Sequence, residues 1–311
     1  LTRGSKPVYW CEECGSALAE AEVEYADKES KAIDFLFPIE SNQLKEVFND
    51  ITSENTFIAS WTTTPWTIPS NKAICFNSKF KYELVELKSK GKIFNLVICS
   101  DLIEDTLERY EIENFVKLGS TTGDKLSNLI CSHPFLDQKS PLISGDHVTA
   151  EMGTGFVHTA PAHGLEDYEA CKELEIDLTS PVKADGKFNE GIPYVGGQNI
   201  KDANEIVIAL LEQKGFLLAN KKYLHSVSTC WRHKIPLFFR ATPQWFISMN
   251  QADLLKDSEN MVEEINWLAD WGKSRISAMM DERPDWCISR QRTWGVPIPL
   301  VIHKETGEPH K

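Results

Sequence analysis

The pattern of apolar and polar positions predicts several strands in the first part of the chain. Residues 56–62 are rich in β-branched and aromatic side chains, residues 81–87 alternate between apolar and polar, and residues 93–99 form a short apolar run. Residues 19–25 alternate apolar and acidic side chains, so we expect a strand there as well, despite their helix-favouring composition. Glycine-containing turns are expected further along, at Gly119, Gly123, Gly145 and Gly186.

Helical spacing is clearest over residues 202–214, where Ile206, Leu210 and Leu211 share a face and Gly215 follows as a stop signal. Residues 101–107 also have helical spacing and begin with an Asp, and an acid-rich helix is expected to start at Glu166. Helices therefore occur singly and do not alternate strictly with strands. This order favours an α+β fold built around a β-barrel-rich domain over a doubly wound sheet.

The first knuckle-like segment and a change in composition near residue 222 divide the chain into three predicted parts. We expect a first segment over residues 1–26, a central domain over 27–222 and a return segment over 223–311. Tryptophans recur in the last part, at Trp231, Trp245, Trp267, Trp271, Trp286 and Trp294. The chain begins with Leu and has no apolar signal core, so we interpret it as a piece of a longer protein. An apolar run of about 18 residues or more, as a membrane span requires, is absent.

Composition and charge narrow the class of protein. The chain has 311 residues, of which 41% are hydrophobic and 25% charged, as is ordinary for a soluble globular protein. Its net charge of −13 argues against a general nucleic-acid binder, but it leaves room for one locally held nucleotide end. Eight cysteines in a chain of this size do not form a dense disulfide framework, so we expect a reducing, cytoplasmic compartment. Five are predicted to be small buried hydrophobes: Cys75, Cys99, Cys131, Cys171 and Cys287.

The other three cysteines belong to two short knuckles. Cys11 and Cys14 are separated by two residues, and Cys230 and His233 have the same spacing. Together they supply the four ligands that a tetrahedral structural zinc ion requires. The alternative is that both are unliganded surface loops, since more than 200 residues separate them. A catalytic zinc is less favoured, because it normally keeps an open position.

Two separated strings carry the candidate chemistry. Residues 61–71 read WTTTPWTIPSN and offer the hydroxyls of Thr62, Thr63 and Thr64 with the carboxamide of Asn71. Residues 153–168 read GTGFVHTAPAHGLEDY and offer two imidazoles, a glycine-rich backbone and a carboxylate. No sulfur or serine nucleophile is evident in either string, so they suggest activation of a water molecule. The plainer alternatives are a β-branched strand end, a hydrogen-bonded core histidine at His158 and a helix cap at Asp167.

Both strings resemble the signature strings of the editing domain of isoleucyl-tRNA synthetases, a large insertion in the catalytic fold of these class I enzymes. Segments 6–11, 17–25, 230–234, 240–249 and 283–297 resemble the regions entering and leaving that insertion, so the likeness covers essentially the whole chain. Pro65 directly after three threonines points to the isoleucyl branch. The ATP-site signatures His-Ile-Gly-His and Lys-Met-Ser-Lys-Ser are absent. ATP and Mg are therefore expected to serve only a missing catalytic domain.

The resemblance implies proofreading of valyl-tRNA(Ile). A pocket built for isoleucine rejects valine poorly, because one missing methylene is worth only about 1–3 kcal/mol. The implied partners are the tRNA(Ile) 3′ end carrying valine, the two discriminated amino acids and the rest of the synthetase. The alternative is a non-catalytic module that binds the tRNA 3′ end.

By carry-over from the family, the threonines and Asn71 line the pocket around the terminal adenosine and the ester. Asp167 anchors the α-ammonium group, and His158 helps to exclude isoleucine. Backbone N–H groups near Gly155 are expected to stabilise the oxyanion. The remaining residues expected to contact the substrate are Trp66, Phe156 and His163.

Overall fold

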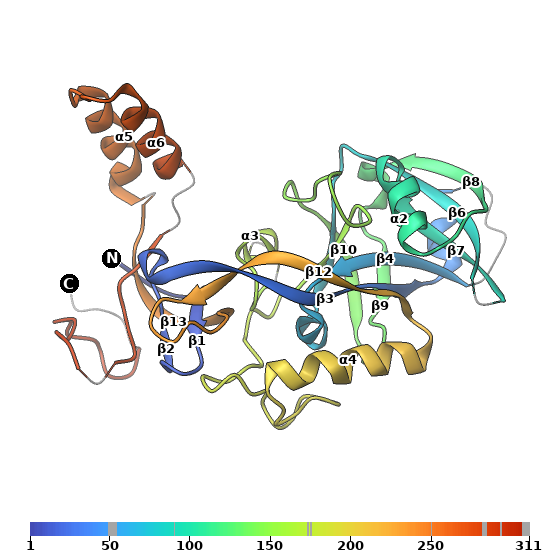
Figure 1. Cartoon of the computed structure of the whole chain (residues 1–311), viewed down its shortest axis with the longest axis horizontal. Coiled ribbons are helices and arrows are strands. Elements are labelled where there is room, and N and C mark those ends of the chain that lie inside the picture. Colours follow the sequence, from blue (N-terminus) through green and yellow to red (C-terminus); the bar gives the residue numbers. More distant parts are fainter. Residues whose placement is uncertain are drawn as a thin grey trace.

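A twisted ribbon of two long antiparallel strands, β3 (Val23–Ile39) and β12 (Leu217–Cys230), runs through the middle of the molecule (Figure 1). The computed structural model describes residues 1–48, 55–89, 91–172, 174, 176–249, 251–281, 285–292 and 294–306. One end of the ribbon belongs to a large sheet, and the other end reaches a small sheet near the chain termini. The boundaries predicted at residues 26 and 222 both lie within this ribbon, and the three-part division stays a prediction.

The large sheet is mixed and open. Its strands follow the order β11-β5-β10-β9-β3-β4-β7-β6-β8, and β12 pairs with β3 beside this path. The pairs β5–β10 and β4–β7 are parallel, and the other pairs along the path are antiparallel. The strands not yet given bounds are β4 (Thr56–Thr62), β5 (Ala73–Phe76), β6 (Lys81–Ser89), β7 (Lys92–Cys99), β8 (Phe115–Thr122), β9 (Ile130–Ser132), β10 (Lys139–Ser144) and β11 (Phe156–Thr159).

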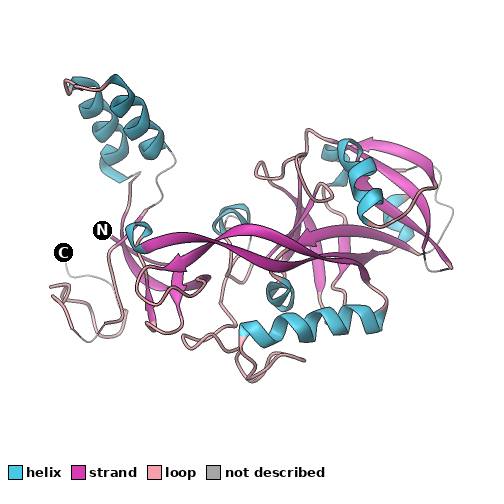
Figure 2. Cartoon of the chain, in the orientation of Figure 1, coloured by secondary structure: helices cyan, strands magenta, loops and turns pink. Residues whose placement is uncertain are grey.

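The α+β class predicted from the sequence is confirmed (Figure 2). The helices do not all occur singly, because Leu165–Cys171 and Ile200–Lys214 follow one another without a described strand between them, as do Leu254–Glu264 and Asp270–Asp281. The path through the described strands ends at β11 and β8, so the sheet does not close into a barrel. The helices are α1 (Ser41–Leu44), α2 (Ile103–Arg109), α3 (Leu165–Cys171), α4 (Ile200–Lys214), α5 (Leu254–Glu264) and α6 (Asp270–Asp281). None of the described helices is long and apolar enough to cross a membrane.

The small sheet collects segments from both ends of the chain. Its order is β14-β13-β1-β2, with β1 (Thr2–Cys11), β2 (Ser16–Ala17), β13 (Phe238–Ile247) and β14 (Trp286–Cys287). Helices α5 and α6 form an antiparallel pair that projects from this end of the molecule (Figure 1).

Most local predictions agree with the structure. The strands expected over 56–62, 81–87 and 93–99 are β4, β6 and β7, and the helix expected over 202–214 is α4. The side chain of Asn199 caps α4 by accepting from the backbone N–H of Lys201, and Gly215 ends it in the left-handed region with φ 76°. Helical structure near residue 101 is also confirmed, as a 3-10 turn at Ser100–Leu102 followed by α2.

The strand predicted over residues 19–25 is wrong in its first half. Glu20–Glu22 form a 3-10 turn, and β3 begins only at Val23. The reason is local hydrogen bonding: the Glu22 carboxylate accepts from the backbone N–H of Ala19 at 2.9 Å and pairs with Arg290 at 3.0 Å. These contacts hold the acidic residues in a turn, which alternation alone cannot reveal.

The core lies on both faces of the large sheet. Successive side chains of a strand point to opposite faces, so Phe35 and Phe37 of β3 enter one apolar cluster and Leu36 enters another. All three are almost completely buried. The five cysteines predicted to be buried hydrophobes are buried, as expected.

Candidate functional site

The two predicted strings meet where β4 lies beside β11. The Ser60 hydroxyl, one residue before the first string, donates to the carbonyl of Phe156 at 3.2 Å and accepts from the backbone N–H of His158 at 2.9 Å. The Thr154 hydroxyl donates to the carbonyl of Ala59 at 2.7 Å. These buried contacts fix the second string against the strand that carries the first.

A cavity of about 90 Å³ lies between the strings. Its lining takes one residue from the first string and four from the second, and the other residues come from the segment before the second string: Trp61, Gly153, Gly155, Phe156, Val157, His147, Val148, Thr149 and Met152. One water needs only roughly 10–15 Å³, so the space can hold a small group. Gly155 has φ 82°, and a Cβ atom there would lie 2.2 Å from the Cβ of Cys99. Only glycine fits at that point of the wall.

His158 does not line this cavity and lies in the core, beside the ring of Phe35. Its side chain is 7% exposed, and both ring nitrogens have partners. Nε2 lies 3.0 Å from the hydroxyl of Thr67, which in turn donates to the carbonyl of Thr64 at 2.9 Å. The Asn71 carboxamide donates to Nδ1 at 2.7 Å and accepts from the Ser140 hydroxyl at 2.6 Å. We call this chain of bonds the His158 relay.

The relay requires a neutral imidazole. Because Asn71 donates to Nδ1, that nitrogen carries no proton, and Nε2–H donates to Thr67. Burial, with smaller contributions from the charges of His133 and His163, lowers the pKa of His158 to about 3. The surroundings of His158 are therefore those of a hydrogen-bonded core histidine, the plainer of the two alternatives. The relay also connects His158 through Thr67 to Thr64, at the end of the three threonines.

His163 and Trp66 are held in a second buried arrangement. Nδ1 of His163 donates to the carbonyl of Phe239 at 2.9 Å, and Nε2 accepts from the hydroxyl of Ser70 at 3.1 Å. Burial lowers the pKa of His163 to about 4. The ring of Trp66 meets that of His163 edge to face at 4.7 Å, and its backbone N–H donates to the carboxamide of Asn204. Neither residue lines the small cavity.

Asp167 lies on the opposite side of β11 from His158. Its carboxylate does not cap α3; the N-cap position is Gly164, and Asp167 accepts from the backbone N–H of Ala160 at 2.7 Å. Burial raises the pKa of Asp167 to about 6, and the charge of His147 opposes this rise. The charge of Asp167 also contributes to the raised pKa of Cys75. Cys75 pairs with Val157 across β5 and β11, so Asp167 lies near the side of β11 that carries Val157.

His147 is the residue of this region that sequence reasoning missed. It lines the small cavity, its charge interacts with Asp167, and its buried Nε2 atom has no hydrogen-bond partner. The only sequence signal is its position after Gly145, which approaches it closely: a Cβ on Gly145 would lie 2.6 Å from the ring. Nothing in the local pattern distinguishes it from an ordinary turn residue.

The three threonines mark the end of β4. Thr62 and Thr63 are half-buried and Thr64 is exposed. The hydroxyls of Thr62 and Thr64 lie 3.2 Å apart, and the Thr62 hydroxyl accepts from the backbone N–H of Thr64. Among the described residues, no hydrogen bond joins these threonines directly to His158 or Asp167. The strings therefore meet, while the predicted set divides between the two sides of β11.

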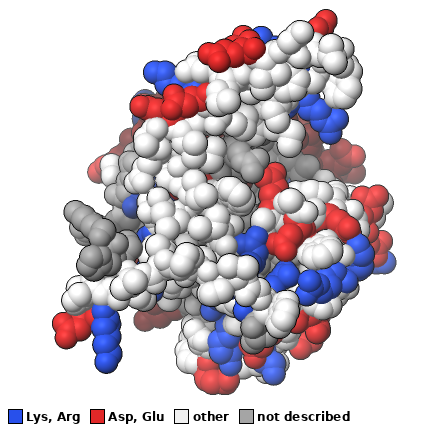
Figure 3. Space-filling view, turned by 90° about the vertical axis from the view of Figure 1, so that its left-hand side faces the viewer, with Lys and Arg blue, Asp and Glu red and all other residues white. Residues whose placement is uncertain are grey.

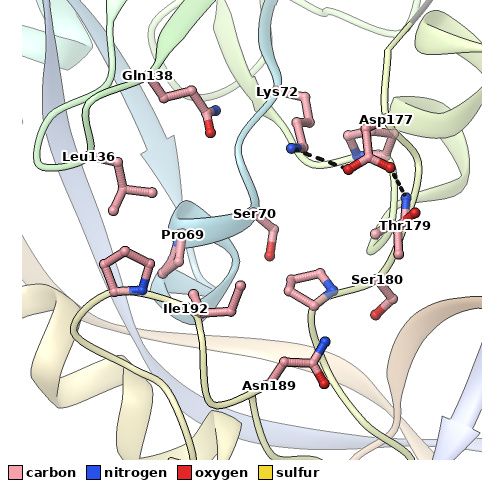
Figure 4. Close-up of a pocket in the computed structure, with 14 residues that line it drawn as sticks. Pro69, Ser70, Lys72, Leu136, Gln138, Asp177, Thr179, Ser180, Asn189 and Ile192 are labelled. Atoms are coloured by element: carbon pink, nitrogen blue, oxygen red, sulfur yellow. Dashed lines mark hydrogen bonds and ion pairs between the residues drawn. The ribbon is translucent and has the colours of Figure 1, made fainter.

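A larger cavity of about 280 Å³ borders other parts of both strings (Figure 4). Pro69 and Ser70 of the first string and Pro161 and Ala162 of the second contribute to its wall. Figure 4 shows Asp177 held between Lys72, at 3.8 Å, and the backbone N–H of Thr179, at 2.9 Å. Because its carboxylate is already paired, this cavity offers no unpaired acid to a cationic ligand.

The two knuckles come together at the end of the ribbon. The ligand atoms of Cys11, Cys14, Cys230 and His233 all lie within 4.8 Å of one another. Measured separations include 3.8 Å between the sulfurs of Cys14 and Cys230, and 3.3 to 3.9 Å from the three sulfurs to Nδ1 of His233. Zinc bonds of about 2.3 Å to sulfur and about 2.0–2.1 Å to nitrogen give tetrahedral edges of roughly 3.5–3.8 Å. The cluster could hold a metal ion and is compatible with zinc.

The knuckles also have matching backbones. Gly15 follows the first with φ 58° and Lys234 follows the second with φ 56°. Their N–H groups donate to the carbonyls of Cys11 and Cys230, at 2.9 and 2.8 Å. Burial raises the pKa of the Cys11 thiol to about 12, so a metal ion would have to displace its proton.

The family model for class I tRNA synthetases (I, L, M and V) matches residues 1–311. The chain therefore belongs to the class I tRNA synthetase family. The isoleucine–tRNA ligases of Francisella tularensis subsp. novicida (strain U112) and subsp. tularensis (strain WY96-3418) are each 48% identical to it over 312 residues, covering 100% of the chain. The resemblance predicted from the two strings is confirmed. The chain spans 33% of the length of these relatives.

Solved structures with similar folds are more distant. They include the crystal structure of GlLeuRS-CP1, with a TM-score of 0.47, 12% identity and coverage of 64% of this chain and 99% of that one. The editing domain of the P. knowlesi cytosolic leucyl-tRNA synthetase has a TM-score of 0.46, 10% identity and coverage of 64% and 97%. Likenesses at this level carry no argument about the site.

Proposed function

We propose that this chain is the editing domain of an isoleucyl-tRNA synthetase and that it hydrolyses the ester of valyl-tRNA(Ile). The observation that supports this most directly is the small cavity bordered by both strings, one of whose lining residues, His147, interacts with the half-buried carboxylate of Asp167. The parent enzyme would ligate isoleucine to tRNA(Ile) with ATP and Mg, using residues outside this chain.

The size of the cavity favours an aminoacyl group as its occupant. About 90 Å³ suits a short aliphatic side chain and is small for a whole nucleoside. The adenosine of the substrate would therefore remain at the mouth. A second site that accepts valine and rejects isoleucine provides discrimination that one methylene cannot supply in a synthetic pocket.

Asp167 is the proposed anchor of the α-ammonium group. Its pKa of about 6 leaves it mostly ionised at neutral pH, and a bound ammonium would favour the ionised form further. Asp167 does not itself line the cavity, but its charge interacts with His147, which does. We therefore place the ammonium near both residues, where the unpaired Nε2 of a neutral His147 can accept a hydrogen bond from it.

The reaction is a direct attack by water on the ester carbonyl. The C–O bond to the ribose breaks, the ribose oxygen takes a proton, and valine and tRNA are released. The hydroxyls of Thr62, Thr63 and Thr64 can both donate and accept, so they can orient the water and a ribose hydroxyl. Backbone N–H groups near Gly155 would stabilise the oxyanion. No covalent intermediate is required.

The His158 relay supports this arrangement from the core. It connects a buried imidazole through Thr67 to the carbonyl of Thr64, and so fixes the end of the threonine string. The family role of His158, exclusion of the isoleucine side chain, is retained here as a proposal. Asn71 is part of the same relay, and we assign it a positioning role.

We further propose that the cysteine–histidine cluster holds a structural zinc ion. Four protein ligands leave no open position, so the ion would cross-link the two knuckles and take no part in hydrolysis. The cluster closes the end of the β3–β12 ribbon, which connects the small sheet to the large one. All eight cysteines are free thiols, in keeping with the reducing, cytoplasmic compartment that we propose.

The rest of the synthetase would contact the end of the molecule that carries the small sheet. Figure 3 views this end, where uncharged residues cover a broad area and charged residues lie mostly around it. The return segment exposes large apolar side chains, among them Leu268, Trp271, Trp294, Val296 and Val301. Exposed apolar surface of this extent is typical of an interface.

Release of amino acid from charged tRNA(Ile) tests the proposal. The isolated chain should release valine from valyl-tRNA(Ile) and leave isoleucyl-tRNA(Ile) intact. Tight binding of valyl-tRNA(Ile) without release would identify a non-catalytic binding module and overturn the proposal. Equal release of both amino acids would remove the discriminating role of the cavity.

A further inference from the structure

A half-exposed row of aromatic side chains begins at the edge of the small cavity. Trp61, which lines the cavity, meets the ring of Tyr223 edge to face at 5.5 Å. Tyr223 is followed by His225, with ring centres 5.6 Å apart and an interplanar angle of 35°. The Tyr223 hydroxyl also lies 3.6 Å from the sulfur of Met152, a second residue of the cavity wall. The row is therefore continuous with the mouth of the cavity.

The strand register separates the charges of the ribbon by face. Tyr223 pairs with Ser30 and His225 with Lys28, so these four side chains share one face, together with Lys221. The acids of this stretch, Asp27 and Glu29, lie on the opposite face. In a chain of net charge −13, this face is aromatic and cationic between residues 28 and 30 of β3 and between residues 221 and 225 of β12.

The two lysines of this face are weakly engaged. Lys221 reaches the exposed Glu111 only at 4.0 Å, and Lys28 has no ion-pair partner among the described residues. The lysines of the opposite face are bound more closely: Lys222 pairs with Glu29 at 2.7 Å and Lys31 with Glu205 at 2.6 Å. The cations next to the aromatic row are thus the ones available to a ligand.

Packing does not account for the rings. Trp61, Tyr223 and His225 belong to none of the buried apolar clusters, and Leu224, on the opposite face of the ribbon, is 69% exposed. His225 is instead held in place by a 3.0 Å contact between its Nε2 and the Ser30 hydroxyl. A fixed, half-exposed aromatic row on a two-stranded ribbon is suited to stacking.

We propose that this aromatic–lysine face, made of Trp61, Tyr223, His225, Lys28 and Lys221, binds the single-stranded 3′ end of the aminoacylated tRNA. The inference rests on the proposed function. A cavity of about 90 Å³ is small for a nucleoside beside the aminoacyl group, so in the proposed complex the terminal bases lie outside it, where the rings begin. Bases stack on aromatic side chains with little regard to sequence, and nearby lysines neutralise the phosphates.

Binding of a short single-stranded RNA with the tRNA 3′-terminal sequence tests this face. Tyr223→Ala should weaken binding about tenfold or more, because one stacking platform is lost. Tyr223→Phe, which keeps the ring and loses only the contact with Met152, should bind like the unchanged chain. Leu224→Ala is the matched control on the opposite face and should have no effect. Lys28→Ala should weaken binding and reduce its salt dependence.

Three results would overturn the inference: unchanged binding in Tyr223→Ala, equal losses in Tyr223→Ala and Leu224→Ala, or equally tight binding of a blunt duplex without a single-stranded end. Thermal melting of each variant separates loss of binding from loss of folding.

The same variants distinguish failure of the proposed function from failure of this inference. Loss of RNA binding in Tyr223→Ala without any deacylation by the unchanged chain would retain the face and remove the hydrolase. Deacylation by Tyr223→Ala with an unaltered KM would retain the hydrolase and remove the face.

Discussion

The two sides of strand β11 differ in how fully their polar groups are bonded. On the inner side, the imidazole of His158 has a partner for each nitrogen, and the relay continues to Asn71 and Thr64. On the outer side, within the part of the chain that the structure describes, His147 has a buried nitrogen without a partner, and Asp167 is a half-buried acid with a raised pKa and a single hydrogen bond, from the backbone N–H of Ala160. Buried polar groups are normally satisfied, so the unpaired nitrogen of His147, which lines the cavity, supports the proposed role of this side in binding a ligand. The bonded groups of the inner side instead support the fold.

The largest expected effect concerns the outer side. Asp167→Ala should lower kcat/KM for valyl-tRNA(Ile) by about 10²-fold or more, since losing a desolvated partner of a charged group costs about 2–5 kcal/mol and each 1.4 kcal/mol is tenfold. Single-turnover deacylation measures the loss. Asp167→Asn is the matched control, because it retains an acceptor for the N–H of Ala160 without the charge. Wild-type activity in the Asn variant would remove the ammonium anchor.

The cysteine–histidine cluster lies away from β11 and therefore allows a comparison with a region outside both sides of that strand. Cys11→Ser should abolish stoichiometric zinc retention and lower the melting temperature by several degrees, while the rate of deacylation at low temperature changes little. Metal analysis and thermal melting provide the two readouts. Cys131→Ala, a buried thiol distant from the knuckles in sequence, is the control. An unaltered melting temperature in Cys11→Ser would argue against a structural ion.

On the inner side, the expected effect is on stability. His158→Ala should cost about 2–4 kcal/mol in the free energy of unfolding, because it opens a cavity and removes one hydrogen bond each from Thr67 and Asn71. Urea denaturation measures the cost. The proposed steric role adds a second outcome, which is hydrolysis of isoleucyl-tRNA(Ile) by the variant. If the rates for both substrates fall together, His158 supports the site without selecting the amino acid.

The smallest effect is the pH dependence of stability, where the two sides act in opposite directions. Burial lowers the pKa of His133 and His163 to about 4 and that of His158 to about 3, so the fold favours their neutral forms. Their contribution to stability is lost as pH falls from about 6.5 towards 4. Asp167 has a raised pKa of about 6, so the fold favours its protonated form, and its contribution falls as pH rises from about 4 to about 6.

Removing the titrating carboxyl group of Asp167 should therefore make the free energy of unfolding rise more steeply with pH. Between pH 4 and 6, Asp167→Asn should increase the slope of the free energy of unfolding by at most about 1.4 kcal/mol per pH unit. Urea titrations at several pH values measure it. A slope that is unchanged or shallower would contradict the buried, proton-favouring setting of the carboxylate.

The local pattern of residue types determined much of the secondary structure of this protein. The periodicity of residues 202–214 with Gly215 behind them predicted α4, and the strands at 56–62, 81–87 and 93–99 followed from residue type. The spacing of the knuckles predicted the four clustered ligands, and the two strings predicted the family. The helix, the strands and the spacing within each knuckle depend on neighbours within a few residues, so the sequence carries them directly. The meeting of the two knuckles, more than 200 residues apart, was inferred from their complementary ligands.

The division of the site depended on contacts between distant segments. Alternation places Phe156 and His158 on one side of β11 and Val157 on the other, but pairing with β5 and the contact with β4 decide which side is interior. The same holds for His147 beside Asp167, and for Tyr223 beside Trp61, which are 162 residues apart. Strand register and burial set these neighbours, and both are properties of the assembled sheet, because a strand acquires an inside only when other strands cover it.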